Sequence, residues 1–241
     1  MEATYQTKAI ILSRQPFREN DCRVIVYSRD RGKIDLVARG TKKISSKLAG
    51  HLEPFNLSDL MVARGRQYDY IGAAISQNCH YNIKTDLEKL FFAAQAVAIF
   101  NKSVKPGEKG EKLFELLQDF LETLNENKLS VIRYQLFYHF FTLNMLAELG
   151  YRPELHNCVI CGNKILPAGN QFNLSKGGLV CASCQKNNKN KHVLPISADC
   201  IKVLRLAVES DLNKLIKLKI NDKLIKEIND IICSFYNFIY C

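Results

Sequence analysis

The stretch CVICGNKILPAGNQFNLSKGGLVCASC, residues 158–184, contains two Cys-x-x-Cys pairs separated by 19 residues. Thiolates are soft ligands, and each pair can present two sulfurs to one ion at about 2.3 Å. The pairs, Cys158 with Cys161 and Cys181 with Cys184, have the spacing typical of a zinc site. Because four thiolates leave no coordination position open for a substrate, the spacing predicts one structural zinc ion.

Two other interpretations of these cysteines are weaker. A redox dithiol requires one Cys-x-x-Cys pair, and an iron–sulfur cluster more often has a third closely spaced cysteine. Gly162, and Gly177 with Gly178, suit the turns of two knuckles and a hairpin. His156 and His192 flank the segment, and we expect them at the surface rather than among the ligands.

The bulk composition predicts a soluble protein with a polyanionic partner. The chain has 241 residues, 47% of them hydrophobic, and a formal net charge of +10. Its N-terminal residues do not form a signal-peptide pattern, and its longest apolar runs are shorter than the ~20 residues that span a bilayer. We therefore expect a cytoplasmic protein whose remaining cysteines are reduced and buried: Cys22, Cys79, Cys200, Cys233 and Cys241. The charge favours nucleic acid or an anionic membrane surface, with solubility alone as the alternative.

Before residue 80 the sequence predicts strands, because short runs rich in Val and Ile alternate with turn-forming stretches. Asp30 and Gly32 suit a hairpin turn between the second and third runs. Five short strands in this length fit a small barrel, and an OB-fold is one of the few of that size. The five runs are KAIILS, CRVIVYS, KIDLVARG, SDLMVARG and YIGAAIS.

After residue 84 the pattern becomes helical. Thr85 and Glu88 form a capping box ahead of an apolar segment that continues to Phe100. Three further helices are predicted at residues 112–124, 130–149 and 197–208, and another begins at Asn221. The helix over 130–149 has aromatic residues almost all round and is therefore expected to be central and buried. We expect the C-terminal helices to pack on the first three.

The segment Arg39-Gly-Thr-Lys-Lys-Ile-Ser-Ser-Lys47 has four positive charges and no negative one. Glycine and hydroxyl residues between the charges suit a loop that lies on phosphates. An OB barrel binds single strands with a basic groove and aromatic stacking platforms. Aromatic candidates for stacking, each of which could instead fill the core, are Phe17, Tyr27, Phe55, Tyr68 and Tyr70.

No enzyme signature is found in the sequence. The segment GEKGEK, residues 107–112, lacks the spacing and the Lys-Ser/Thr end of a nucleotide-binding loop. There is no HExxH, no GxSxG and no spaced carboxylate cluster for two-metal chemistry. We therefore expect a binding protein rather than an enzyme.

Three segments resemble the RecO family of bacterial DNA repair proteins: RGTKKISSKLAGHLEPF (39–55), LAELGYRPELHNCVICG (146–162) and FNLSKGGLVCASC (172–184). The resemblance covers essentially the whole chain. It implies an α+β architecture, with an N-terminal OB-fold β-barrel followed by an all-α domain that contains an inserted four-cysteine zinc finger. The corresponding domains are a nucleic-acid-binding domain over 1–80, a helical domain over 81–150 and 190–241, and the finger over 151–189.

The resemblance also implies a function. RecO proteins bind single- and double-stranded DNA, anneal complementary strands and help to load the RecA recombinase onto strands coated by single-stranded DNA-binding protein. The implied partners are RecR and the acidic C-terminal tail of that coating protein, and the implied location is the cytoplasm, at the nucleoid. By match to the family's basic loop, the residues that contact DNA are Lys33, Arg39, Lys42, Lys43 and Lys47. The chain departs from the family at Ile44, where a basic residue is common.

Two other functional classes remain as alternatives. The first is a zinc-ribbon RNA-binding protein or transcription factor, which would not anneal strands irrespective of their sequence. The second is a non-catalytic scaffold, which would bind a partner protein without affinity for DNA.

Overall fold

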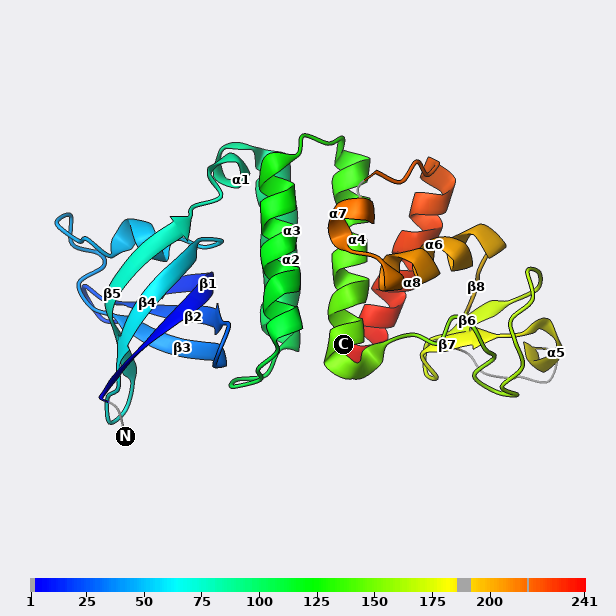
Figure 1. Cartoon of the computed structure of the whole chain (residues 1–241), viewed down its shortest axis with the longest axis horizontal. Coiled ribbons are helices and arrows are strands. Elements are labelled where there is room, and N and C mark those ends of the chain that lie inside the picture. Colours follow the sequence, from blue (N-terminus) through cyan, green and yellow to red (C-terminus); the bar gives the residue numbers. More distant parts are fainter. Residues whose placement is uncertain (1–2, 186–191, 216) are drawn as a thin grey trace. The chain divides into compact units, whose positions relative to one another are not determined.

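The computed structural model describes residues 3–185, 192–215 and 217–241. Backbone contacts group the chain into two compact units, Met1–Lys128 and Leu129–Cys241. The first unit contains a mixed β-sheet, a short 3-10 helix and three α-helices, and the second contains helices and a small sheet (Figure 1). Residues 186–189 of the predicted finger and 190–191 of the predicted helical domain lie outside the described residues.

The N-terminal sheet closes into a barrel with the strand order β1-β2-β3-β5-β4. Strands β3 and β5 pair in parallel, and the other neighbouring pairs, including β4 with β1, are antiparallel. Each of the five predicted runs falls on one of these strands, although the runs that end in Arg39-Gly40 and Arg64-Gly65 extend two residues beyond β3 and β4. Their bounds are β1 Thr4–Pro16, β2 Cys22–Ser28, β3 Gly32–Ala38, β4 Leu57–Ala63 and β5 Asp69–Asn78.

The barrel is filled by alternate residues of its strands, because successive side chains of a strand point to opposite faces. In β2, Val24 and Val26 are fully buried, whereas Arg23 between Cys22 and Val24 is exposed. The interior cluster comprises Tyr5, Ala9, Ile11, Cys22, Val24, Val26, Leu36, Ala38, Leu52, Leu60, Val62, Ile71 and Ala74.

The predicted hairpin between β2 and β3 is confirmed, with Ser28 opposite Gly32. Gly32 has a φ of +70°, and a Cβ atom there would lie 2.1 Å from the carbonyl oxygen of Glu108. Glycine is therefore required both by the turn conformation and by the close approach of the loop that joins α2 to α3.

Three helices complete the first unit: α1 (Tyr81–Thr85), α2 (Leu87–Ser103) and α3 (Glu111–Glu126). Asp86 caps α2, since its carboxylate accepts hydrogen bonds from the backbone N–H groups of Glu88 and Lys89. The predicted capping box is therefore wrong, because the N-cap of α2 is Asp86 and not Thr85. The Thr85 hydroxyl donates instead to the Tyr81 carbonyl of α1.

Helices α2 and α3 pack on the outer face of the barrel through Tyr27. Its ring is fully buried and lies 4.8 Å from the ring of Phe100 and 6.5 Å from that of Phe114, measured between centroids. An ion pair between Arg29 and Glu111 joins the same hairpin to the start of α3. These two helices therefore share a core with the strands.

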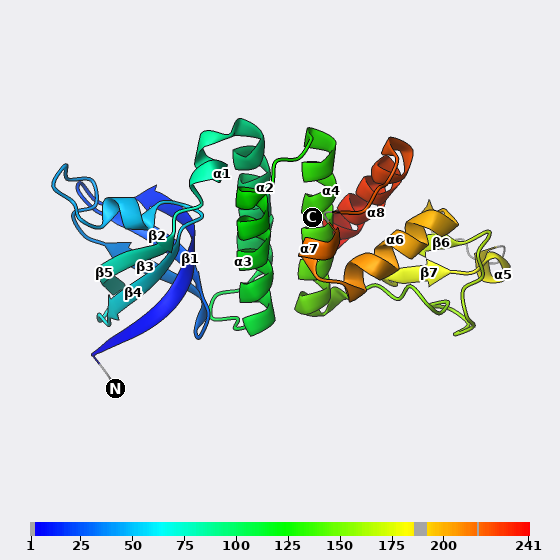
Figure 2. The ribbon, with the colours of Figure 1, turned by 45° about the horizontal axis from the view of Figure 1, so that its top comes forward.

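The second unit is built around α4 (Val131–Leu146), which is followed by a π-helical turn, η2 (Ala147–Tyr151). Helix α4 contacts three later helices, which gather around it in Figure 2. Ser197 and Asn221 cap the first and last of them, as the sequence predicts. The three are α6 (Ala198–Glu209), α7 (Leu212–Leu215) and α8 (Asp222–Tyr240). No helix within the described residues is long and apolar enough to span a membrane.

The expectation that α4 is central is confirmed. Its aromatic residues Tyr134, Phe137, Phe140 and Phe141 are all at most 1% exposed. Among them lies His139, which is 2% exposed. Burial lowers the pKa of His139 to about 4, against smaller opposing effects of the neighbouring Asn229 side chain and the charge of Asp230, both in α8.

The buried His139 should make stability depend on pH. Because its pKa falls from 6.5 in the unfolded chain to about 4 in the fold, the unfolded chain binds the extra proton between these values. Acidification through this range therefore favours unfolding. Between pH 7 and pH 4 the wild-type chain should lose about 3 kcal/mol more stability than a His139→Leu variant, measured by chemical denaturation. Parallel pH profiles for the two proteins would contradict this.

Candidate functional site

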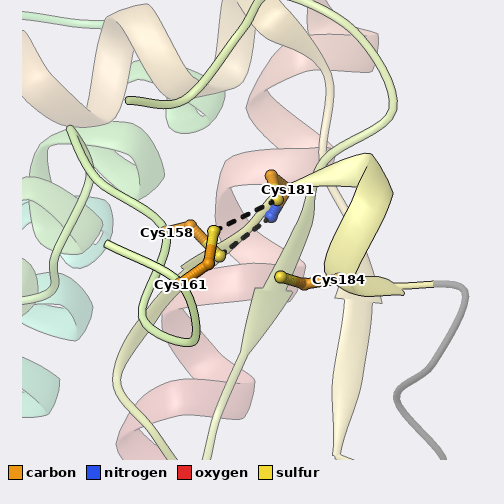
Figure 3. A group of neighbouring side chains, drawn as sticks. All are labelled: Cys158, Cys161, Cys181 and Cys184. Atoms are coloured by element: carbon orange, nitrogen blue, oxygen red, sulfur yellow. Dashed lines mark hydrogen bonds between the residues drawn. The ribbon is translucent and has the colours of Figure 1, made fainter. Parts of the chain in front are cut away.

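The four paired cysteines lie together in the second unit (Figure 3). Cys158 and Cys161 are in the loop that precedes β6, and Cys181 and Cys184 follow β7 at the start of the short helix α5. Their sulfur atoms all lie within 4.8 Å of one another. The elements that bring them together are β6 (Gln171–Asn173), β7 (Gly178–Val180), α5 (Ala182–Gln185) and β8 (Val193–Pro195), whose strands form one antiparallel sheet.

The geometry of the cluster fits a tetrahedral metal ion. Sulfur ligands at about 2.3 Å from one ion lie about 3.8 Å apart. The sulfurs of Cys161 and Cys181 are 3.8 Å apart. The backbone N–H of Cys181 also donates to the Cys158 sulfur at 3.4 Å, and both contacts are drawn in Figure 3. The four cysteines can therefore hold one metal ion.

The ionisation of the thiols explains why a cation suits the cluster. Burial raises the pKa of Cys158, but backbone N–H groups of Cys161, Cys181 and Ile160 outweigh this and lower it to about 6. The pKa of Cys184 is raised to about 12, first by its hydrogen bond with Cys161 and also by the charge of Cys158. One thiolate forms readily, whereas several together require a positive charge to offset their repulsion.

The glycines in the turns around the cluster have the backbone conformation that the sequence predicts. Gly162 and Gly177 have φ values of +75° and +62°, in the left-handed region that favours glycine. The N–H of Gly162 donates to the carbonyl of Cys158 at 2.9 Å, which closes the first knuckle. The predicted knuckle and hairpin are both confirmed.

The two flanking histidines contact other residues. His156 Nε2 lies 3.2 Å from a carboxylate oxygen of Glu209, and the ring of His192 lies 5.3 Å from that of Phe238. Both are exposed, as the sequence predicts.

The cysteines outside the cluster differ in exposure. Cys22 and Cys200 are buried as expected, but Cys79 and Cys241 are exposed.

The basic loop, residues 39–47, connects β3 to the short 3-10 helix η1 (Ala49–Leu52). Its four cations, Arg39, Lys42, Lys43 and Lys47, are all exposed. The structure therefore groups four of the five predicted DNA contacts on one loop of the barrel.

Two further loops adjoin the basic loop. The ammonium of Lys42 donates to the Arg18 carbonyl, in the β1–β2 loop, at 3.0 Å. The guanidinium of Arg39 lies 4.0 Å from the ring centroid of Tyr70, and Tyr68 of the β4–β5 loop contacts Phe17 at 5.4 Å between ring centroids. Cations of the basic loop therefore lie beside Arg18 and beside half-buried aromatic rings.

Lys33 has a different environment. Its ammonium donates to the carbonyl of Asn101 and, at 3.1 Å, to that of Val104 at the end of α2. Burial lowers its pKa. A phosphate could reach Lys33 only if the ammonium left these carbonyls.

The aromatic candidates divide into two groups. Phe17, Tyr68 and Tyr70 lie beside the basic loop and are half-buried. Tyr27 and Phe55, at 0% and 8% exposure, fill the core, which is the alternative that the sequence left open for each aromatic residue. Periodicity alone does not separate these groups, because the helices that cover Tyr27 are distant in sequence.

Sequence reasoning missed Asp21, which holds the basic loop in place. Its carboxylate accepts a hydrogen bond from the N–H of Gly40 at 2.9 Å. Asp21 is 19 residues from Gly40, and no local pattern pairs the two loops.

Comparison with known proteins agrees with this architecture. The family model of the recombination protein O N terminal region matches residues 1–78, and that of the C terminal region matches residues 84–239. The chain belongs to the RecO family. Because the two models together cover nearly the whole chain, both units are family features.

Individual RecO relatives are similar over most of their length. The DNA repair protein RecO of Desulforamulus reducens is 31% identical over 234 residues, which cover 97% of this chain and 89% of the relative. The DNA repair protein RecO of Thermoanaerobacter sp. is 27% identical over 95% of this chain and 90% of the relative. That of Dehalococcoides mccartyi is 30% identical over 93% of this chain and 86% of the relative. The chain is thus a RecO-type DNA repair protein.

Proposed function

We propose that this RecO protein is a recombination mediator without enzymatic activity. It binds single- and double-stranded DNA, anneals complementary strands and helps to load RecA onto strands coated by single-stranded DNA-binding protein, in the RecFOR pathway. The observation that carries the proposal is the exposed basic loop beside half-buried aromatic rings. Cations that neutralise phosphates and rings that stack on bases are the two components of sequence-independent strand binding.

The barrel is an OB-fold in this proposal, and residues 1–80 form its nucleic-acid-binding domain. Support comes from the closed order β1-β2-β3-β5-β4 with a parallel β3–β5 pair. OB-folds bind oligonucleotides with the face of strands 2 and 3 and with the loops that follow strands 1 and 4. In this chain those loops contain Arg18 and Tyr68, next to the basic loop.

The DNA contacts are Arg39, Lys42, Lys43 and Lys47, whose side chains are exposed. Lys33 joins them only in a state in which its ammonium has left the end of α2. The contacts go to phosphates, so binding is strong at low salt and does not depend on base sequence.

The four-cysteine cluster holds one structural zinc ion. Its all-sulfur donor set is the one that closed structural zinc sites use, and such a site contributes folding free energy without taking part in a reaction. The protein partners are RecR and the acidic tail of the coating protein. The protein acts in the cytoplasm, at the nucleoid.

Strand annealing tests the proposal. Complementary strands, each pre-coated with single-stranded DNA-binding protein, should form duplex faster when the wild-type chain is added, for several unrelated sequences. A transcription factor or RNA-binding protein would not anneal them irrespective of sequence, and a scaffold would bind the coating protein without binding naked strands. Either of those results would reject the proposal.

A further inference from the structure

The apolar side chain of Ile44 is completely exposed at the tip of the basic loop. Its relative exposure is 108%, compared with 84% for Leu87 and 63% for Ile75 elsewhere in the same unit. Single exposed apolar residues are common on protein surfaces. What distinguishes Ile44 is that it contacts almost nothing while it lies in a run of cations.

The backbone around Ile44 forms two successive turns. The N–H of Lys43 donates to the Gly40 carbonyl at 3.2 Å, and the N–H of Ser46 donates to the Lys43 carbonyl at 2.9 Å. Ile44 is therefore the first corner residue of the second turn, where its side chain is fully exposed.

The base of the basic loop is held to the barrel. The N–H of Lys42 donates to the Asn20 carbonyl at 3.1 Å, and the buried Thr41 hydroxyl donates to the Ala38 carbonyl at 3.2 Å. With the hydrogen bond from Gly40 to Asp21, these contacts fix both the position and the direction of the tip. The exposure of Ile44 is thus imposed by an ordered turn.

We propose that Ile44 is a wedge that inserts between adjacent bases of the DNA strand held by the basic loop. Lys42 and Lys43 immediately precede it and Lys47 follows, so phosphates bound to these cations would bring stacked bases against the tip. Apolar residues such as Ile are the ones that nucleic-acid-binding proteins insert into base steps. The wedge rests on the proposed function, and it would give the protein a means of separating stacked bases before they pair.

The test uses DNA in which 2-aminopurine replaces one adenine, since its fluorescence rises when it is unstacked. The full-length chain is compared with Ile44→Ser, with Ile44→Leu, which keeps an apolar wedge, and with Leu87→Ser as an exposed control. Wild type, Ile44→Leu and Leu87→Ser should raise the fluorescence at saturation, and Ile44→Ser should abolish the rise. Because the cost of unstacking offsets much of the gain from burying Ile44, Kd should change by less than about tenfold in Ile44→Ser.

Failure of the wedge can be distinguished from failure of the DNA site. If Ile44→Ser gives the wild-type fluorescence rise while binding still depends on Arg39, Lys42 and Lys43, the wedge is wrong and the phosphate contacts stand. If binding does not depend on those cations, the proposed DNA site itself is wrong. If Ile44→Ser gives the wild-type fluorescence rise but no longer retains a purified protein partner in a pull-down, Ile44 is a protein contact and the wedge is rejected.

Discussion

Replacing Cys158 and Cys181 by serine is expected to remove the zinc ion and to lower the Tm of the protein by about 10 °C or more. Bound metal contributes folding free energy, and the strands β6 and β7, of three residues each, are too short to hold the loops around the cluster together without it. The wild-type chain should carry one zinc ion per molecule, measured by elemental analysis of the purified protein. Thermal unfolding followed by circular dichroism measures the loss of stability.

The matched control for this change is Cys79→Ser with Cys241→Ser. Both of these cysteines are exposed and lie outside the cluster, so the double variant should keep its zinc and its Tm. The strand affinity of the Cys158/Cys181 variant should stay near wild type at a temperature where it is folded, because the basic loop belongs to the other unit. A wild-type protein purified without metal, and with the same Tm as the zinc-loaded form, would refute the structural role.

Changing Arg39, Lys42 and Lys43 together to alanine should sharply weaken strand binding and its dependence on salt. Each phosphate contact on a single strand contributes about 0.7 to the slope of log K against log salt, so three lost contacts should flatten the slope by about 2. The loss should be similar for unrelated sequences, because phosphate contacts do not read bases. The fold should survive, since exposed loop charges contribute little to stability.

A second triple variant, with Lys105, Lys109 and Lys112 changed to alanine, is the control for the loss of net charge. These lysines are exposed and lie in the α2–α3 loop and at the start of α3, and their removal lowers the formal net charge of +10 by the same amount. This variant should keep nearly the wild-type slope. If the basic-loop variant kept its affinity and slope while Lys176→Ala lost them, the DNA site would lie on the finger, and the division of roles between the two units would be wrong.

The sequence predicts the local structure of this protein well because local signals decide it. Runs of Val and Ile predict all five barrel strands, and Ser197 and Asn221 mark the beginnings of α6 and α8. The spacing of the cysteines predicts the cluster, since two Cys-x-x-Cys turns can close on one ion irrespective of the surrounding fold.

The sequence does not predict long-range packing. The sequence predicts the strand that contains Tyr27 and the helices α2 and α3, but not that Tyr27 packs against Phe100 of α2 and Phe114 of α3. The packing of α2 on the barrel also explains why the ammonium of Lys33, which the sequence predicts to contact DNA, donates to carbonyls at the end of α2. A one-dimensional pattern records that a side chain is apolar or charged, but not which distant element covers it.

The most direct test of the account is the annealing of coated complementary strands by the basic-loop variant. The wild-type chain and the Lys105/Lys109/Lys112 variant should accelerate duplex formation, and the Arg39/Lys42/Lys43 variant should fail to do so, with zinc content and Tm unchanged in all three. If the basic-loop variant annealed coated strands at the wild-type rate, the claim that this loop of the barrel carries the DNA on which the protein acts would be contradicted.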